Sequence, residues 1–262
     1  MASSFVSAGL RFQLGGMTHV GRKRAHNEDS FLLQAEDRLA VVADGMGGHA
    51  SGEVASRLAV ETIGRYFRDS FDEPEVAWPY KMGRGVRAQQ HRLSTAVKLA
   101  NAHIWETSQK NAAQQGMGTT VVAALFFEEK VLVAHVGDSR VYRLRGGAFE
   151  QLTDDHSLIN DYMKMKNLRA DEVGNFPQKN VIVRALGMKE SVQVDIVVEQ
   201  ARAGDVYVLC SDGLSGMVTD REIAQLASGD VDAAAGRLVD AANERGGVDN
   251  ITVLIARVDA AA

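Results

Sequence analysis

Short apolar runs separated by tight turns dominate three parts of this chain. Neighbouring runs with connections too short for a crossover helix are expected to pair antiparallel. The glycine pair at 146–147 also favours a hairpin, because glycine tolerates positive φ. The pattern predicts strands at 31–34, 38–44, 119–127, 131–136, 140–144, 148–152, 192–198, 206–211 and 251–258.

Helical periodicity appears in pairs between these groups of strands. Apolar stripes predict long helices over 51–68 and 86–111, separated by a loop at 72–85 that holds two of the three prolines. A capping box, Thr219 to Glu222, opens a helix over 219–228, and a second stripe from Val231 to Ala242 marks another. Paired helices between groups of strands predict an α+β fold with antiparallel sheets rather than a doubly wound parallel sheet.

Composition and charge limit the function classes. The 262 residues fit one large domain or two small ones, and 45% hydrophobic with 24% charged residues is ordinary for a globular protein. A net charge of -5 with scattered basic residues argues against a nucleic-acid or anionic-membrane partner. A single cysteine, Cys210, excludes a disulfide framework. Without a signal peptide or a long apolar run, we expect a cytoplasmic protein.

Several carboxylates share one sequence context at strand ends. Four aspartates abut an apolar run where glycine lets the backbone turn, and an acidic pair precedes the run 31–34: Asp44, Asp138, Asp212, Asp249, and Glu28 with Asp29. Any one aspartate alone is explained as well by an Asx-turn. If they converge, one like-charge pair at about 4 Å costs about 4 kcal/mol, so either some carboxyls are protonated or cations neutralise them. Oxygen ligands without cysteine favour Mg2+ or Mn2+, in a binuclear site.

Two nearby features allow more than one interpretation. Arg24 could grip a phosphate in bidentate fashion, or could be a surface residue paired with Glu28. Residues 45–50 match G-x-G-x-x-A after a strand, as in dinucleotide-binding proteins. That interpretation is disfavoured, because Asp44 would face the pyrophosphate and the next apolar strand lies far beyond a compact βαβ unit.

With these residues in place, the sequence resembles metal-dependent type 2C serine/threonine protein phosphatases of the compact bacterial form. The resemblance spans residues 12–258 and rests on six motifs in the family's order: Arg24-x-x-Asn27-Glu28-Asp29, Asp44-Gly45-Met46-Gly47-Gly48-His49, Gly118-Thr119-Thr120, Gly137-Asp138-Ser139-Arg140, Ser211-Asp212-Gly213 and Asp249-Asn250. It implies one catalytic domain over 1–262, built as a central sandwich of two antiparallel sheets flanked by pairs of antiparallel helices.

The resemblance also implies roles for individual residues. Asp44 would bridge two Mn2+ or Mg2+ ions, and Gly45 would give its carbonyl to one of them. Asp212 and Asp249 would complete the other, with Glu28 and Asp29 ligating directly or through water. Asp138 with Asp212 would hold a third, weaker ion, and Arg24 would clamp the substrate phosphate. A hydroxide bridging the two ions would then attack the phosphorus directly, without a phosphoenzyme.

One departure leaves the general acid unassigned. Eukaryotic members carry a histidine directly after the Asp-Gly pair, whereas this chain has Met46, as is common in bacterial members. His49 is near in sequence but could equally be a loop or capping residue, and metal-bound water could supply the proton. The segment 157–184 matches the family's variable flap beside the cleft, and we hypothesise that it selects the phosphoprotein.

The function expected from the resemblance is hydrolysis of phosphoserine and phosphothreonine in proteins, opposing a serine/threonine kinase, by a monomer. Two alternatives belong to other classes: a catalytically silent member that binds phosphoproteins, and a hydrolase of small phosphoesters. Degenerate members usually lose metal aspartates, and none is missing here.

Overall fold

Two antiparallel sheets form the centre of the molecule, in a computed structural model that describes residues 3–47, 51–70, 88–168 and 181–261. The first sheet has the order β1 (Ser3–Ser7), β2 (Leu10–His19), β12 (Ile251–Ala260), β11 (Val206–Cys210), β8 (Arg140–Arg145), β9 (Ala148–Gln151). The second has the order β10 (Asp195–Gln200), β7 (Lys130–Val136), β6 (Val121–Phe127), β4 (Leu39–Met46), β3 (Asp29–Gln34), with β5 (Gly118–Thr119) paired to β4.

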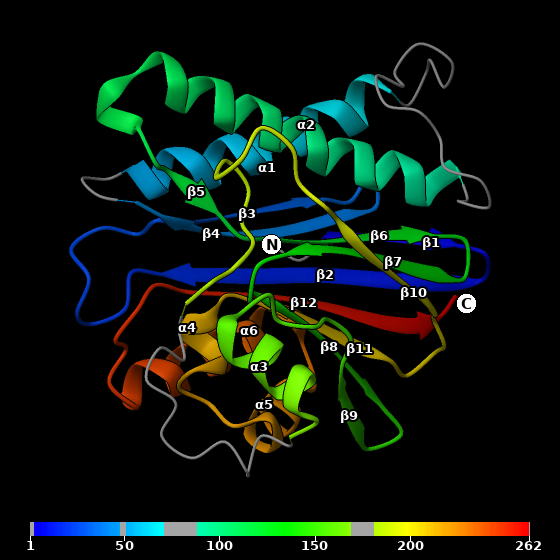
Figure 1. Cartoon of the computed structure of the whole chain (residues 1–262). Coiled ribbons are helices and arrows are strands. Elements are labelled where there is room, and N and C mark those ends of the chain that lie inside the picture. Colours follow the sequence, from blue (N-terminus) through cyan, green and yellow to red (C-terminus); the bar gives the residue numbers. More distant parts are fainter. Residues whose placement is uncertain (1–2, 48–50, 71–87, 169–180, 262) are drawn as a thin grey trace.

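Helices cover the outer face of each sheet (Figure 1). The second sheet is covered by α1 (Ser51–Asp69) and α2 (Ala88–Lys110), which also pack against each other. The first sheet is covered by α6 (Val231–Glu244), with α4 (Asp212–Ser215) and α5 (Asp220–Leu226) beside it, and α3 (Leu158–Lys166) follows β9. The predicted α+β sandwich between helix layers is therefore confirmed.

Period-2 alternation in the strands explains the layering. In β4, Ala40 and Val42 pack into the core between the sheets, whereas Leu39 and Val41 face the core under α1 and α2. Both sets are fully or almost fully buried. A strand buried on both faces reads as a continuous apolar run, which is the pattern the sequence carries here.

Some elements differ from the sequence prediction. The run 119–127 is interrupted at Thr120, whose N–H donates to the Asp44 carbonyl at 2.8 Å, so β5 and β6 are separate strands. Strand β10 begins at Asp195 rather than at residue 192, opposite His135 of β7. The predicted loop at 72–85 lies outside the described residues.

The N-terminal strands β1 and β2 and the helices α3 and α4 were not predicted. In β2, Gly15 and Gly16 weaken the strand signal. Both are needed because neighbours approach closely: a Cβ at Gly15 would lie 2.7 Å from Val231 Cγ2, and one at Gly16 would lie 2.2 Å from Leu254 Cδ2.

Candidate active site

The acidic residues singled out in the sequence come from both sheets and meet at one end of the sandwich. Asp29 and Asp44 are directly opposite each other in the β3–β4 pair of the second sheet. Asp212 begins α4 just after β11, and Asp249 precedes β12, the neighbour of β11 in the first sheet. Asp138 lies in the turn between β7 and β8. The charges of the other four all contribute to the electrostatics of Asp44.

Asp29 joins the two sheets through its carboxylate. Ser211 Oγ, directly after β11, and Thr252 Oγ1, in β12 of the first sheet, donate to Asp29 Oδ2 at 2.8 Å and 2.7 Å. Among the described residues, the buried Oδ1 of the same carboxylate has no hydrogen-bond partner. Burial raises the pKa of Asp29, and the charges of Asp212 and Asp249 raise it further against these two hydroxyl donors.

Asp44 is held by its backbone. Its N–H donates to Thr120 Oγ1 at 3.1 Å, and its carbonyl accepts from Thr119 Oγ1 at 2.8 Å. Burial, followed by the charges of the surrounding aspartates, raises the pKa of Asp44 well above its usual range. The pKa of Asp212 is also raised, by burial and then by Asp249, and a hydrogen bond with the Asp44 side chain only partly offsets this.

Asp138 lines an open cavity of about 350 Å³ together with Asp212 and Asp249. Burial and the charge of Asp212 raise the pKa of Asp138 to about 7. Its Oδ1 is buried, and no described group hydrogen-bonds to it. The cavity wall also contains an ion pair that was not predicted, in which Arg140 donates to Asp155 at 3.0 Å and 2.6 Å. Its sequence signal was weak, since Asp155 follows no glycine turn.

Glu28 and Gly45 are in close contact beside the aspartates. Gly45 N–H donates to the Glu28 carbonyl at 3.2 Å, and a Cβ on Gly45 would lie 2.2 Å from the Gly52 carbonyl oxygen. Burial raises the pKa of Glu28, although Arg24 opposes the shift. Asn250 fixes this corner, because its Oδ1 accepts from Glu28 N–H at 2.8 Å. The sequence motif contained Asn250, but no role was predicted for it.

Arg24 pairs with Asp249 rather than with Glu28. Its Nη2 donates to Asp249 Oδ2 at 2.7 Å, and the Arg24 side chain is 50% exposed. The surface pairing considered from the sequence therefore has a different partner. The guanidinium is left at the mouth of the acidic cluster, where part of it faces solvent.

The acidic cluster fits hard divalent cations. Its carboxylates have few donors, two buried oxygens of Asp29 and Asp138 lack partners within the described chain, and several pKa values are raised because the negative charges are not compensated. Mg2+ and Mn2+ prefer such oxygen ligands and would neutralise these charges.

The remaining candidates for a nucleophile or a proton donor are either unsuited to that role or lie outside the described residues. Burial raises the pKa of Cys210 to about 12, so a thiolate nucleophile is disfavoured. Met46 ends β4 opposite Gly118 and offers no proton. His49 lies outside the described residues, and the general acid stays unassigned.

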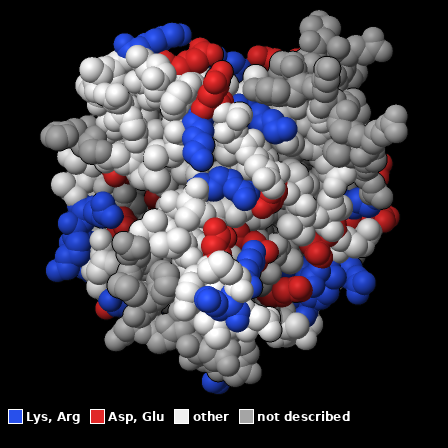
Figure 2. Space-filling model, viewed as in Figure 1, with Lys and Arg blue, Asp and Glu red and all other residues white. Residues whose placement is uncertain are grey.

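Charged side chains of both signs share the face of the molecule drawn in Figure 2. Figure 2 shows acidic and basic side chains interspersed over the described part of the visible face. No helix among the described residues is long and apolar enough to cross a membrane.

Comparison with known proteins gives the class. The model of the family "Protein phosphatase 2C" matches residues 16–249. Protein phosphatase PhpP of Streptococcus pneumoniae serotype 2 is 35% identical over 244 residues, covering 91% of this chain and 94% of that protein. The crystal structure of the Mycobacterium tuberculosis serine/threonine phosphatase PstP/Ppp superposes with a TM-score of 0.83 at 36% identity, covering 95% of this chain and 99% of the other.

A further solved structure bears on the metal. The catalytic domain of the serine/threonine phosphatase PstP, in complex with two manganese ions, has a TM-score of 0.80 at 35% identity and covers 95% of this chain and 99% of that one. The chain belongs to the protein phosphatase 2C family. The resemblance to bacterial type 2C serine/threonine phosphatases is thereby confirmed.

Proposed function

We propose that this chain is a Mn2+- or Mg2+-dependent phosphatase that removes phosphate from phosphoserine and phosphothreonine in proteins. The observation that supports it most strongly is the convergence of Asp29, Asp44, Asp212 and Asp249 from two sheets, with carboxylate oxygens left without donors. A purely structural cluster of this kind would destabilise the fold, because each uncompensated pair costs free energy.

The proposed ligands follow the geometry. Asp44 is followed by Gly45, whose N–H donates to the Glu28 carbonyl, and Asp212 and Asp249 come from the segments that adjoin β11 and β12 of the first sheet. Glu28 and Asp29 would ligate directly or through water, and Asp138 with Asp212 would hold a third, weaker ion. The bound ions would supply Lewis-acid activation of water and neutralise charge on the phosphoryl group.

Arg24 is proposed as the phosphate clamp. It is attached to the cluster through Asp249, and half of its side chain is accessible. Once cations neutralise Asp249, the guanidinium would be free to make two parallel hydrogen bonds to a phosphate. Its five donors and fixed planar shape suit that task better than a lysine would.

The partners and setting are part of the same proposal. The substrates would be phosphorylated proteins, including those of an opposing serine/threonine kinase, and the enzyme would act as a monomeric single catalytic domain over 1–262 in the cytoplasm. The coverage of 95% of this chain by a known phosphatase structure supports the single domain. Sedimentation of the purified protein would test the monomer, and cell fractionation would test the compartment.

Segment 157–184 is proposed to select the phosphoprotein. Of this segment, 157–168 and 181–184 are described, and Met165, Val181 and Val183 are exposed apolar residues within it. Exchange with the segment of a relative should alter preference among phosphoproteins but not hydrolysis of p-nitrophenyl phosphate. Unchanged protein preference would refute this role.

The decisive experiment compares a phosphothreonine peptide with sugar phosphates, in Mn2+ and then in EDTA. Metal-dependent release of phosphate from the peptide, with little from the sugar phosphates, is the expected result. Preference for sugar phosphates would instead indicate a hydrolase of small phosphoesters. Binding of the peptide without turnover would indicate a silent binding protein.

A further inference from the structure

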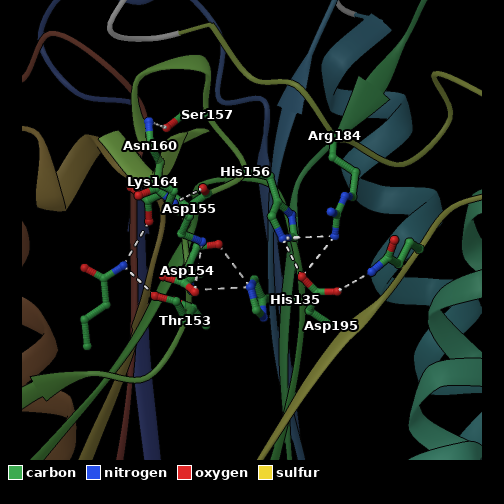
Figure 3. Close-up of polar contacts among 12 residues, drawn as sticks. His135, Thr153, Asp154, Asp155, His156, Ser157, Asn160, Lys164, Arg184 and Asp195 are labelled. Atoms are coloured by element: carbon green, nitrogen blue, oxygen red, sulfur yellow. Dashed lines mark hydrogen bonds and ion pairs between the residues drawn. The ribbon is translucent and has the colours of Figure 1, made fainter. Parts of the chain in front are cut away.

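A second polar cluster lies behind the Asp138 turn and comes from four segments of the chain. His135 of β7 and Asp195 of β10 are directly opposite each other in the second sheet. His156 follows β9, and Arg184 precedes β10. Both histidine side chains are buried, at 2% and 6% exposure. Figure 3 shows Arg184, Asp195 and His156 pointing toward one another.

His156 holds the backbone of the Asp138 turn at two points. Gly137 N–H donates to His156 Nδ1 at 3.0 Å, and His156 N–H donates to the Gly137 carbonyl at 2.9 Å. A backbone N–H can only donate, so His156 Nδ1 must carry a lone pair rather than a proton. The ring proton is therefore on Nε2, which lies 2.9 Å from Asp195 Oδ2 and donates to it.

Asp195 fixes this tautomer, and Arg184 fixes Asp195. Arg184 Nη1 donates to Asp195 Oδ2 at 3.0 Å. Burial raises the pKa of Asp195, but the His156 hydrogen bond and the charge of Arg184 outweigh it, so the pKa lies below its usual range. Asp195 is thus a carboxylate able to accept the Nε2 proton. Partners of this kind determine which ring nitrogen of a histidine is protonated.

The turn that His156 holds has little freedom to relax toward other neighbours. Gly137 has φ +107°, and a Cβ there would lie 2.6 Å from Thr120 Cβ. On the other side, Ser139 Oγ is 2.7 Å from Thr120 Oγ1. Asp138 lies between Gly137 and Ser139 in the chain, and its side chain lines the cavity. The direction of that carboxylate therefore depends on the backbone that His156 fixes.

The cluster is poorly shaped for a metal ion of its own, although its ligand atoms lie within 4.8 Å of one another. The two imidazole rings are stacked, with centroids 4.8 Å apart and planes only 16° from parallel. Lone pairs lie in the ring planes, so those of stacked rings run side by side and do not converge on one ion. Arg184 Nη1 is also 3.1 Å from His156 Nε2 and would repel a cation.

We infer that His156, oriented by Asp195, is a positioning residue that aims Asp138 at the third, weaker metal site. This inference rests on the proposed function, since that site is part of it. His156 acts on the ion through Gly137 and Asp138 and does not itself touch substrate or metal. Loss of the Nδ1 acceptor should free the turn and weaken the third site, leaving the Asp44 pair of ions in place.

Two substitutions separate the two nitrogens of the ring. In His156→Asn the amide oxygen falls near the place of Nδ1 and can still accept from Gly137, whereas in His156→Gln the amide nitrogen falls near Nε2 and can still reach Asp195. Changes in residues that orient a metal ligand typically alter metal affinity 10–100-fold. We expect His156→Gln to raise the Mn2+ concentration for half-maximal p-nitrophenyl phosphate hydrolysis about tenfold or more. His156→Asn should raise it no more than about threefold.

Calorimetry should show that His156→Gln loses the weak Mn2+ site and retains two ions. Combined with Asp138→Asn, it should add nothing further, because both changes act on one ion; an additive loss would overturn the inference. Equal Mn2+ dependence of the Gln and Asn variants would do the same. Absence of metal-dependent turnover in the unmodified protein would instead overturn the proposed function.

A measurement without metal or activity tests the tautomer itself. Nitrogen-15 spectra of the unmodified, metal-free protein should place the His156 proton on Nε2, and a proton on Nδ1 would overturn the inference. Asp195→Asn is the second variant should His156→Gln fail to fold. It should move part of the His156 population to the Nδ1–H form and raise the Mn2+ requirement several-fold.

Discussion

The acidic cluster and the histidine cluster contain similar groups and differ in how their charges are balanced. Around Asp44, buried carboxylates have mostly one another as neighbours, and their pKa values are raised. Around His156, the carboxylate of Asp195 has a guanidinium and an imidazole N–H, and its pKa is lowered. The negative charge of the first region is uncompensated, whereas that of Asp195 is compensated by its neighbours.

This contrast separates the acidic cluster, the proposed cation site, from the histidine cluster, which is proposed to position one of its ligands. A group of side chains that neutralise one another has little to offer a cation, even when its atoms lie within metal-ligand distance. A group left with like charges and unpartnered oxygens stores unfavourable free energy that a bound cation relieves. The electrostatic imbalance, rather than the number of acidic residues, marks the site.

The largest loss of activity is expected from removing the carboxylate at the centre of the acidic cluster. Asp44→Asn should abolish turnover, by at least about a thousandfold in kcat, because the charges of all four other aspartates act on Asp44. Calorimetric titration with Mn2+ should show that the two tight ions are lost. The matched control, Asp240→Asn on the exposed side of α6, should keep normal kcat. Normal turnover of Asp44→Asn would contradict the binuclear site.

A smaller effect is expected at the edge of the acidic cluster. Asp138→Asn should reduce activity about tenfold at limiting Mn2+ and leave two ions bound, because Asp138 is proposed to serve only the third ion. Saturating Mn2+ should restore most of the rate. The measurement is activity against Mn2+ concentration, with metal counts from anomalous scattering. A variant that bound fewer than two ions would show that Asp138 belongs to the central pair.

The pH dependence of metal-free stability should follow the acidic cluster. Asp138 has an ordinary pKa of 3.8 in the unfolded chain and about 7 in the folded protein, so its favourable contribution is full below pH 3.8 and lost as pH rises through 7. Each such group changes stability by at most about 1.4 kcal/mol per pH unit.

Urea unfolding in EDTA should therefore show the Asp138 contribution falling between about pH 4 and pH 7, and Mn2+ should reverse the trend because it binds the deprotonated carboxylates. The histidine cluster acts in the opposite direction. Burial lowers the pKa of His135 to about 4, below its ordinary 6.5, so its contribution is present above pH 6.5 and lost as pH falls toward 4. Equal slopes of the unmodified protein and Asp138→Asn between pH 4 and 7 in EDTA would contradict the charge imbalance.

The smallest predicted effect is on stability, where substitutions in the two clusters should have opposite signs. In EDTA near pH 7.5, Asp44→Asn should stabilise the protein by about 1 kcal/mol, because it removes a buried carboxyl whose ionisation is unfavourable in the folded state. Asp195→Asn should destabilise it by about 1–2 kcal/mol, because a charged acceptor of three hydrogen bonds is lost. Thermal unfolding of both variants beside the unmodified protein measures the difference, and shifts of the same sign would refute it.

Most of the fold could be predicted from the chain because its strands are nearly continuous apolar runs with short turns. The missing elements had weaker signals for physical reasons. Gly15 and Gly16 weaken the strand signal of β2. Only the structure shows that glycine is required there, because Val231 and Leu254 pack against these positions. The sequence predicts one strand over 119–127, whereas the hydrogen bond from Thr120 to Asp44 separates β5 from β6 in the structure.

The aspartates of the proposed site could be predicted from the sequence, but the residues that hydrogen-bond to them could not. Asp44, Asp138, Asp212 and Asp249 each follow or precede a strand beside a glycine, a pattern visible in one dimension. Hydroxyl donors such as Ser211 carry no such mark, because their role depends on which strand of the other sheet lies above them. The Arg24 partner was wrong for the same reason, since Asp249 is distant in sequence.

The bond from Thr252 to Asp29 links strands of different sheets whose residues lie 223 positions apart in the chain. A nascent chain still lacking β12 therefore has neither Thr252 nor a placed Asp249. Phosphatase activity should appear abruptly, when β12 inserts between β2 and β11, so chains truncated before β12 would be unable to dephosphorylate anything in the cell.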